Sequence, residues 1–247
     1  MKRYIFLCDV DGTLVRNGIT PPIVVSCAKN YMESGGLLAL CTGRSALSAG
    51  PIAGEFGVNM PCVLYGGAML YDFRSRKIIW SQAFAPGIGD VICFIYDRFP
   101  ALSLQVYTQD AIFTLRRNEK LTSKGIPSEN TGPLYAPADV RGDVLKLVLS
   151  CDDRDLLAKC LESLPDEICI ASFASRHFID VVPRGAGKAE AMRRISELYN
   201  VPYERFFCAG DSLNDLPMLK LSGRSYAPAN ALPPVLEAVS LRVGAAG

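Results

Sequence analysis

The chain has 247 residues, 49% of them hydrophobic, which is enough to bury a substantial core as one large or two modest domains. Its 26 Lys and Arg residues nearly balance 25 Asp and Glu residues, so the net charge of +1 gives no basic surface of the kind that nucleic acids require. The longest apolar runs, such as residues 35–41 and 144–149, are too short to span a bilayer, and the N-terminus enters a predicted strand directly instead of a signal peptide. We therefore expect a cytoplasmic protein that binds neither nucleic acid nor membrane.

The first part of the chain alternates strand and helix patterns. Strands are predicted at 3–8, 37–41 and 62–65, and helices at 21–34 and 46–56. Alternation of this kind builds a parallel, doubly wound sheet, in which ligands bind at the carboxyl ends of the strands.

A hairpin is predicted at 71–80, and the pattern then changes to that of an α+β domain. Helices are predicted at 87–98 and 153–163, strands at 103–107, 111–115, 144–149, 168–172 and 177–182, and a stretch rich in Gly, Pro and Ser at 125–137. A helix at 189–199 and a strand at 205–209 resume the first pattern. The sequence thus predicts an α/β fold, with a doubly wound, Rossmann-like parallel sheet core over residues 1–81 and 184–247 and an inserted α+β domain over residues 82–183.

Two carboxylates follow the first predicted strand, in the segment Asp9-Val10-Asp11-Gly12-Thr13. Residues two apart in an extended strand point the same way, so Asp9 and Asp11 can face one ligand, and Gly12 allows a sharp turn beneath them. Two such acids favour a hard, oxygen-seeking cation such as Mg²⁺. For this segment taken alone, an ordinary Asp-Gly turn is the alternative.

Three later segments supply complementary groups. Thr42-Gly43-Arg44 follows a predicted strand and offers a hydroxyl and backbone amides as a seat for phosphate. Lys188 stands near the start of a predicted helix, where its ammonium can serve both phosphate oxygens and a buried carboxylate. The segment Gly210-Asp211-Ser212-Leu213-Asn214-Asp215 follows another predicted strand and gathers acids again.

These four motifs, in this order and spacing, resemble those of haloacid dehalogenase (HAD) superfamily phosphatases. Nearly the whole chain resembles their Cof-type group, in which a C2-type cap is inserted after the third core strand. The resemblance implies that residues 82–183 form this cap, a small antiparallel sheet with two helices that supplies substrate-reading residues. It also implies a Mg²⁺-dependent phosphatase of small phosphorylated metabolites.

The resemblance assigns a role to each motif in the hydrolysis of a phosphate monoester. Mg²⁺ held by Asp9, the backbone carbonyl of Asp11 and Asp211 would cancel the repulsion between carboxylate and phosphate. Asp9 would attack phosphorus to form an aspartyl-phosphate, while the side chain of Asp11 would protonate the leaving group and afterwards deprotonate water. The remaining phosphate oxygens would be bound by Thr42, Gly43 and Lys188.

Four further polar residues have supporting roles for which alternatives stay open. Arg44 is either a phosphate contact or a member of a structural ion pair. Asn214 and Asp215 order metal-bound water or hold Lys188, with capping of the next helix as the alternative. For Ser212, helix capping explains the residue as well as metal contact does.

The chain departs from the family pattern at two places. Many relatives carry Asn-Gly-Ala after the third strand, whereas this chain has Tyr65-Gly66-Gly67-Ala68 and lacks the polar side chain. Relatives also usually continue from an Ala-Asn-Ala segment, here Ala229-Asn230-Ala231, through another strand and a Gly-Val-Ala-like turn, whereas this chain stops at Gly244-Ala245-Ala246-Gly247. The substrate therefore stays open, with sugar phosphates as one option.

Two other functions also stay open on the sequence alone. Sugar phosphomutases of the same superfamily share the Asp-Val-Asp-Gly-Thr motif, and a relative without catalysis would act as a binding or regulatory protein. The chain keeps every acid needed for the chemistry, and Lys188 as well, which favours an enzyme. The expected partner is a small-molecule phosphate ester, and the expected assembly is a monomer or a small homo-oligomer.

The nine cysteines indicate neither disulfides nor a zinc site, because they are odd in number and show no CxxC spacing. We expect reduced and mostly buried thiols. Cys8 and Cys41 adjoin predicted catalytic strands, but a nucleophilic thiol needs a nearby base and His177 is the one histidine. A catalytic cysteine is therefore disfavoured.

Basic residues of the inserted domain indicate substrate contacts less clearly than the four motifs indicate the site. Arg176 and His177 stand at the start of its last predicted strand, where they either contact substrate or pack, and packing is favoured for the histidine. A solvated loop is expected for Arg116, Arg117 and Lys120.

Overall fold

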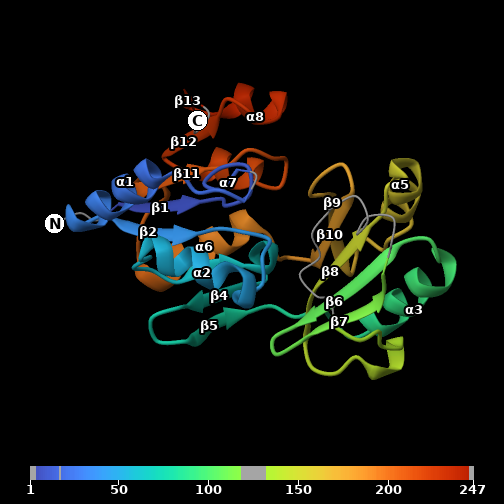
Figure 1. Ribbon diagram of the computed structural model, residues 1–247. Helices are drawn as coiled ribbons and strands as arrows, with labels where there is room; N and C mark the ends of the chain where they lie inside the picture. Colours follow the sequence, from blue (N-terminus) through green and yellow to red (C-terminus); the bar gives the residue numbers. More distant parts are fainter. Residues whose placement is uncertain (1–3, 17, 118–131, 245–247) are drawn as a thin grey trace. The chain divides into compact units, whose positions relative to one another are not determined.

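The computed structural model describes residues 4–16, 18–117 and 132–244 (Figure 1). The chain divides into two compact units, the first made of Met1–Ser81 and Gly187–Gly247 and the second of Gln82–Ala186. The sequence predicts the second boundary slightly earlier, after residue 183.

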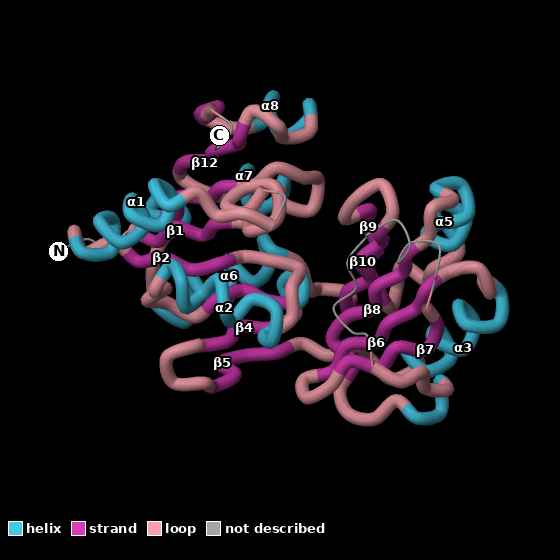
Figure 2. The backbone as a smooth tube through the Cα atoms, viewed as in Figure 1, coloured by secondary structure: helices cyan, strands magenta, loops and turns pink. Residues whose placement is uncertain are grey.

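A five-stranded parallel sheet lies at the centre of the first unit (Figure 2), with the strand order β13-β12-β11-β1-β2. Its strands are β1 (Ile5–Cys8), β2 (Leu37–Leu40), β11 (Phe206–Ala209), β12 (Arg224–Pro228) and β13 (Leu241–Val243). The central strands are short apolar runs, as expected for parallel strands covered on both faces. Ile5, Leu7 and Leu40, for example, are fully buried.

A three-stranded antiparallel sheet continues the first unit beside β2. Its strands are β3 (Cys62–Leu64), β4 (Met69–Asp72) and β5 (Lys77–Ser81), and a 3-10 turn (Tyr65–Gly67) joins β3 to β4. A parallel bridge between Cys41 and Val63 connects the end of β2 to β3. The turn after β3 therefore lies next to the residues that follow β2.

Helices cover the parallel sheet of the first unit. They are α1 (Pro22–Glu33), α2 (Ala46–Phe56), α6 (Lys188–Tyr199), α7 (Leu216–Leu221) and α8 (Pro233–Ala238), with a 3-10 turn at Tyr203–Arg205. α1 contacts α2, and α6 contacts α7. Because crossovers between parallel strands are right-handed, α1, which leads to β2, and α7, which leads to β12, lie on opposite faces of the sheet.

The direction in which the chain crosses the sheet reverses at β1. β1 pairs with β2 on one side and with β11 on the other, and from β11 the chain continues outward to β12 and β13. In doubly wound sheets such a reversal opens a crevice at the carboxyl ends of the strands. The segments that follow β1, β2 and β11 meet at this edge.

An antiparallel sheet with the strand order β7-β6-β8-β10-β9 forms the second unit. Its elements are β6 (Ser103–Thr108), β7 (Ile112–Arg116), β8 (Val144–Ser150), β9 (Cys169–Phe173), β10 (Phe178–Pro183), α3 (Ile88–Arg98), α5 (Arg154–Glu162) and a 3-10 turn at Pro137–Asp139. Apolar side chains of both helices share one core with alternate strand residues such as Leu104 and Leu147. Since successive strand residues point to opposite faces, both helices cover the same face.

Polar side chains occupy the other face of this sheet. Lys146 Nζ lies 2.8 Å from Asp180 Oδ2, and the two side chains are only 6% and 14% exposed. The ammonium also lies 5.9 Å from the centre of the Tyr107 ring. The second unit thus contains a nearly buried ion pair that the sequence does not predict.

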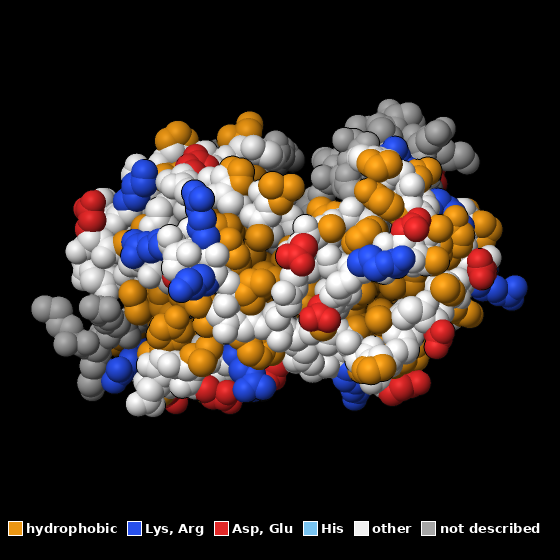
Figure 3. Space-filling model, turned by 90° about the horizontal axis from the view of Figure 1, so that it is seen from below, with side chains coloured by type: hydrophobic (Ala, Val, Ile, Leu, Met, Phe, Trp, Pro, Cys, Tyr) orange, Lys and Arg blue, Asp and Glu red, His pale blue; other side chains and the backbone are white. Residues whose placement is uncertain are grey.

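The predicted fold class, a doubly wound α/β core with an inserted α+β domain, is confirmed. The sequence does not predict β12, α8 or β13, and contrary to expectation a further strand, β13, does follow Ala229-Asn230-Ala231. No helix in the described part of the chain is both long and apolar enough to cross a membrane. On the face that Figure 3 shows, Lys, Arg, Asp and Glu side chains are scattered over each unit, with hydrophobic side chains exposed among these charged ones.

The expectation of a solvated loop is wrong for Arg116. This residue belongs to β7, and its guanidinium donates hydrogen bonds to the carbonyl oxygens of Tyr96 (2.8 Å) and Phe99 (3.2 Å) while lying 4.1 Å from the centre of the Tyr96 ring. Its charge therefore ties β7 to the end of α3. Lys120 lies outside the described residues.

Candidate active site

The loop after β1 carries Asp9 into the interior of the first unit. The Asp9 N–H donates to the carbonyl of Ala209 on the neighbouring strand at 2.9 Å, which fixes the backbone of the residue. Its side chain is buried, with Oδ1 accepting a hydrogen bond from Lys188. Oδ2 is also buried and has no hydrogen-bond partner among the described residues. One carboxylate oxygen of Asp9 therefore remains to be satisfied by a ligand.

Gly12 lets the loops after β1 and β11 approach each other. Its φ of +91° is a left-handed conformation, and a Cβ atom built there would lie 2.1 Å from Asp211 Oδ2. The Gly12 carbonyl accepts a hydrogen bond from Asn230 Nδ2 at 2.9 Å. The sequence motifs do not predict this contact of Asn230 with the loop after β1, and the Ala229-Asn230-Ala231 segment was its only signal.

Lys188 lies between two carboxylates as the first residue of α6. Its Nζ is 2.6 Å from Asp9 Oδ1 and 2.5 Å from Asp215 Oδ1, and its side chain is 2% exposed. Burial works against the charged form, but the carboxylates of Asp215 and Asp9 outweigh it and hold the pKa of Lys188 well above its usual value. The ammonium therefore stays charged inside the site.

The position of Lys188 depends on close backbone contact between two glycines. A Cβ atom built on Gly67, in the turn after β3, would lie 2.2 Å from the carbonyl carbon of Gly187. Gly67 has φ = +109°, and the two residues before it, Tyr65 and Gly66, also have positive φ values of +51° and +67°. Gly67 therefore allows the first turn of α6 to pack directly against the turn after β3.

Asp215 holds the loop after β11 as well as Lys188. Its side chain is fully buried, and Oδ2 accepts hydrogen bonds from the N–H groups of Asp211 (3.1 Å) and Ser212 (3.0 Å). The Ser212 hydroxyl lies 2.7 Å from Asn214 Oδ1 and 3.1 Å from Asp215 Oδ2. The Asp215 side chain makes no capping hydrogen bond to α7. Of the alternatives that the sequence leaves open, contact with Lys188 is therefore the observed one.

Three carboxylates converge here with an excess of negative charge. Oxygen atoms of Asp9, Asp211 and Asp215 lie within 4.8 Å of one another. Burial raises the pKa of Asp9 to about 7. The ammonium of Lys188 lowers this pKa and the carboxylate of Asp215 raises it, but burial is the largest of the three effects. Burial and Asp215 raise the pKa of Asp211 to about 6. With all three carboxylates ionised, the cluster would carry two more negative charges than the ammonium of Lys188 balances, which fits a divalent cation with oxygen ligands.

The segment after β2 brings Thr42 and Arg44 to the same edge. Thr42 is buried, its N–H donates to the Val63 carbonyl at 2.9 Å, and its hydroxyl accepts a hydrogen bond from the Arg44 N–H at 3.2 Å. Arg44 Nε and Nη2 donate to the two carboxylate oxygens of Asp11 at 2.8 and 2.7 Å. The ion-pair alternative for Arg44 is the observed one, and its partner is Asp11.

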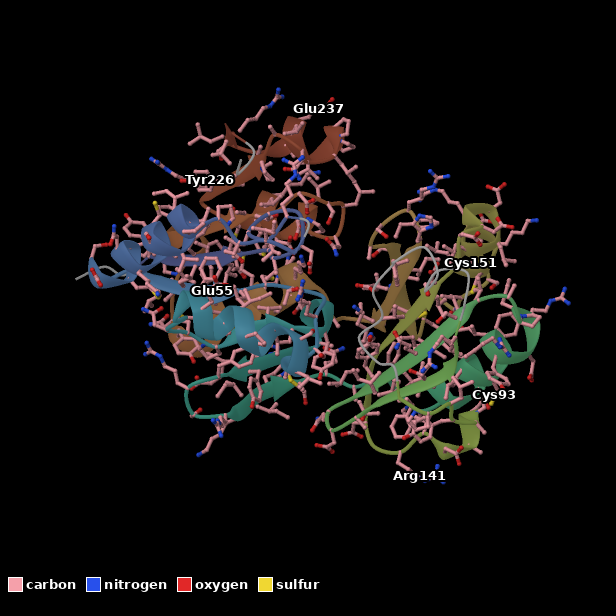
Figure 4. All side chains as sticks on the ribbon, in the orientation of Figure 1. Glu55, Cys93, Arg141, Cys151, Tyr226 and Glu237 are labelled. Atoms are coloured by element: carbon pink, nitrogen blue, oxygen red, sulfur yellow. The ribbon has the colours of Figure 1, made fainter. Side chains whose placement is uncertain are left out.

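The thiols near the site are buried. Burial, reinforced by the Asp9 carboxylate, raises the pKa of Cys8 well above its usual value, and burial does the same for Cys41. Neither thiol is therefore a nucleophile at neutral pH. All nine cysteines lie in the described part of the chain and are free thiols; Cys93 and Cys151 are labelled in the second unit in Figure 4.

Residues 6–244 match the family model of the haloacid dehalogenase-like hydrolases. The chain belongs to this family. The match spans both units, and the prediction of a HAD phosphatase of the Cof-type group is confirmed.

Two curated relatives and one solved structure are similar to the chain along most of its length. The chain is 23% identical to 5-amino-6-(5-phospho-D-ribitylamino)uracil phosphatase YwtE of Bacillus subtilis, across 91% of this chain and 87% of the relative. It is 22% identical to the HMP-PP phosphatase of Klebsiella pneumoniae, across 91% of this chain and 84% of the relative. The structure of the sugar phosphatase BT4131, of HAD subclass IIB, superposes with a TM-score of 0.84 at 17% identity and covers 98% of this chain and 93% of its own.

Proposed function

We propose that this enzyme hydrolyses small phosphorylated metabolites in a Mg²⁺-dependent reaction, with Asp9 as the nucleophile. The observation that carries the proposal is the arrangement around Asp9: one oxygen is held by Lys188 at 2.6 Å, while the other is buried without a partner among the described residues. The names of the relatives support phosphate esters of metabolites as substrates, sugar phosphates among them.

Mg²⁺ would be held by Asp9, Asp211 and the backbone carbonyl of Asp11. The unpartnered oxygen of Asp9 and the excess negative charge support this donor set. The cation would neutralise phosphate oxygens and reduce their repulsion of the nucleophile. Asp215 is a less suitable ligand because both of its oxygens already accept hydrogen bonds from Lys188, Asp211 and Ser212.

The chain's own groups would perform the chemistry in two steps. Asp9 attacks phosphorus, the bond to the leaving oxygen breaks, and an aspartyl-phosphate forms; water then attacks that phosphorus and releases phosphate. The side chain of Asp11 donates a proton to the leaving oxygen in the first step and accepts one from water in the second. Lys188, with the Thr42 hydroxyl and the Gly43 amide, binds the transferring phosphoryl oxygens.

A panel of phosphate monoesters tests the proposal. Purified protein is incubated with sugar phosphates, other phosphorylated metabolites and p-nitrophenyl phosphate, with Mg²⁺ or with EDTA, and released phosphate is measured. We expect release that depends on Mg²⁺ and disappears in the Asp9→Asn variant. The absence of metal-dependent release from every ester would refute the proposal. Fast isomerisation of a hexose phosphate that far exceeds phosphate release would assign the enzyme to the phosphomutases instead.

A further inference from the structure

The ion pair between Arg44 and Asp11 joins two segments that are far apart in the sequence. It is bidentate, with Nε donating to Oδ2 at 2.8 Å and Nη2 to Oδ1 at 2.7 Å. The side chains are 28% and 59% exposed, and exposed pairs of this kind contribute at most about 1 kcal/mol to stability. Two parallel hydrogen bonds nevertheless define the plane and direction of a carboxylate. The pair therefore constrains geometry more than it stabilises the fold.

Arg44 is the better anchored of the two partners. Its N–H donates to the Thr42 hydroxyl at 3.2 Å, and its carbonyl accepts from the Tyr65 N–H at 3.0 Å. Its third guanidinium nitrogen, Nη1, donates to the Ser48 carbonyl at 3.4 Å. Asp11, in contrast, is exposed and followed by the conformationally free Gly12. Arg44 can thus restrict the rotation of the Asp11 side chain.

We propose that Arg44 is a positioning residue, which holds the Asp11 carboxyl group in one orientation for proton transfer to and from the reacting oxygens. This inference rests on the proposed function, in which Asp11 serves as acid and base. All three guanidinium nitrogens of Arg44 already donate to protein oxygens, which disfavours a role as a phosphate ligand. Arg44 acts through Asp11 and does not itself touch the substrate.

The leaving group of the substrate separates positioning from other roles. An alkyl phosphate needs a proton on its leaving oxygen, whereas p-nitrophenolate leaves without one. Because Asp11 also serves the second step, which both substrates share, the first step is followed by itself. The single-turnover rate of leaving-group release, together with KM, is measured on a sugar phosphate and on p-nitrophenyl phosphate for wild type, Arg44→Gln, Arg44→Lys, Asp11→Asn and the Arg44→Gln/Asp11→Asn double variant. Arg193→Gln is the control, because Arg193 forms an exposed ion pair with Glu190 at 3.2 Å on α6.

We expect Arg44→Gln to lower the first-step rate on the sugar phosphate by about 10-fold or more, part of the ~10²–10⁴-fold that acid–base assistance supplies. KM and the first-step rate on p-nitrophenyl phosphate should change by less than about 3-fold. Arg44→Lys should not restore the rate, since a single ammonium cannot make the bidentate contact. In the Asp11→Asn background, Arg44→Gln should cause no further loss, because residues that act as a unit are non-additive.

Three results would overturn the inference. A raised KM on both substrates with unchanged kcat would make Arg44 a phosphate ligand. Equal losses of the first-step rate on both substrates would reduce Arg44 to a structural residue, and multiplicative losses in the double variant would show that it acts independently of Asp11. If the wild-type enzyme releases no phosphate from either substrate, the proposed function fails and the inference fails with it. The other three results leave the wild-type enzyme active, so the two kinds of failure can be distinguished.

Discussion

Replacing Lys188 by Met tests the charge balance of the buried site. Met has a similar length and no charge, so the change removes the ammonium that lies 2.6 Å from Asp9 and 2.5 Å from Asp215. Removing one partner of a buried ion pair costs about 3–5 kcal/mol. Since 1 kcal/mol shifts the melting temperature of a domain of this size by about 2–4 °C, the expected decrease is roughly 6–20 °C. Without Lys188, kcat should fall by about 10²–10³-fold.

Thermal unfolding in EDTA measures the predicted loss of stability. Lys220→Met is the matched control, because Lys220 is exposed on α7 and its replacement should change stability by less than about 0.5 kcal/mol. Combining Lys188→Met with Asp215→Leu should recover little of the stability and none of the activity, since the Asp9 carboxylate stays buried without its partner and the N–H groups of Asp211 and Ser212 lose their acceptor. A melting temperature of Lys188→Met within about 2 °C of wild type in EDTA would refute the reasoning.

Three further predictions concern pH, the metal and the second unit. Because the folded-state pKa values of Asp9 (about 7) and Asp211 (about 6) lie above the unfolded values, the metal-free folded protein binds more protons, and its stability in EDTA should fall as pH rises from about 4 to 7. The urea midpoint of unfolding should decrease with pH across this range, and the decrease should be smaller in the Asp9→Asn variant and in the presence of Mg²⁺. A midpoint in EDTA that increases with pH would contradict the prediction. Gly12→Ala should weaken Mg²⁺ binding, measured by calorimetry, by at least about 10-fold, because its Cβ would meet Asp211 Oδ2 at 2.1 Å; unchanged affinity would exclude Asp211 as a ligand. In the second unit, Asp180→Asn should cost about 3–5 kcal/mol in urea unfolding, whereas Lys146→Met with Asp180→Leu should be nearly neutral, and an equal cost for both would exclude charge burial as the cause.

The sequence alone determined which segments reach the site. Short apolar runs predict buried parallel strands, and the motif residues follow those strands directly, so Asp9, Thr42 and Asp211 had to meet at the carboxyl edge of the sheet. Lys188 could be placed there as well, because it begins the helix that precedes β11. These are local properties of strands, turns and helix starts, which a one-dimensional pattern records.

Tertiary structure decided which of these groups contact each other. The sequence could not choose between capping and ion pairing for Asp215, or between phosphate binding and ion pairing for Arg44, since both alternatives use the same side chain at the same local position. The choice depends on distances between residues far apart in the chain, such as Lys188 to Asp215 and Arg44 to Asp11.

The close approaches of glycines were equally invisible in the sequence. Gly12 against Asp211 and Gly67 against Gly187 are needed because a Cβ atom would overlap a partner from another segment. β12, α8 and β13 were also missed. β12 and β13 join a sheet whose other strands had already been predicted, and pairing with that sheet, more than the local pattern of these short segments, makes them strands.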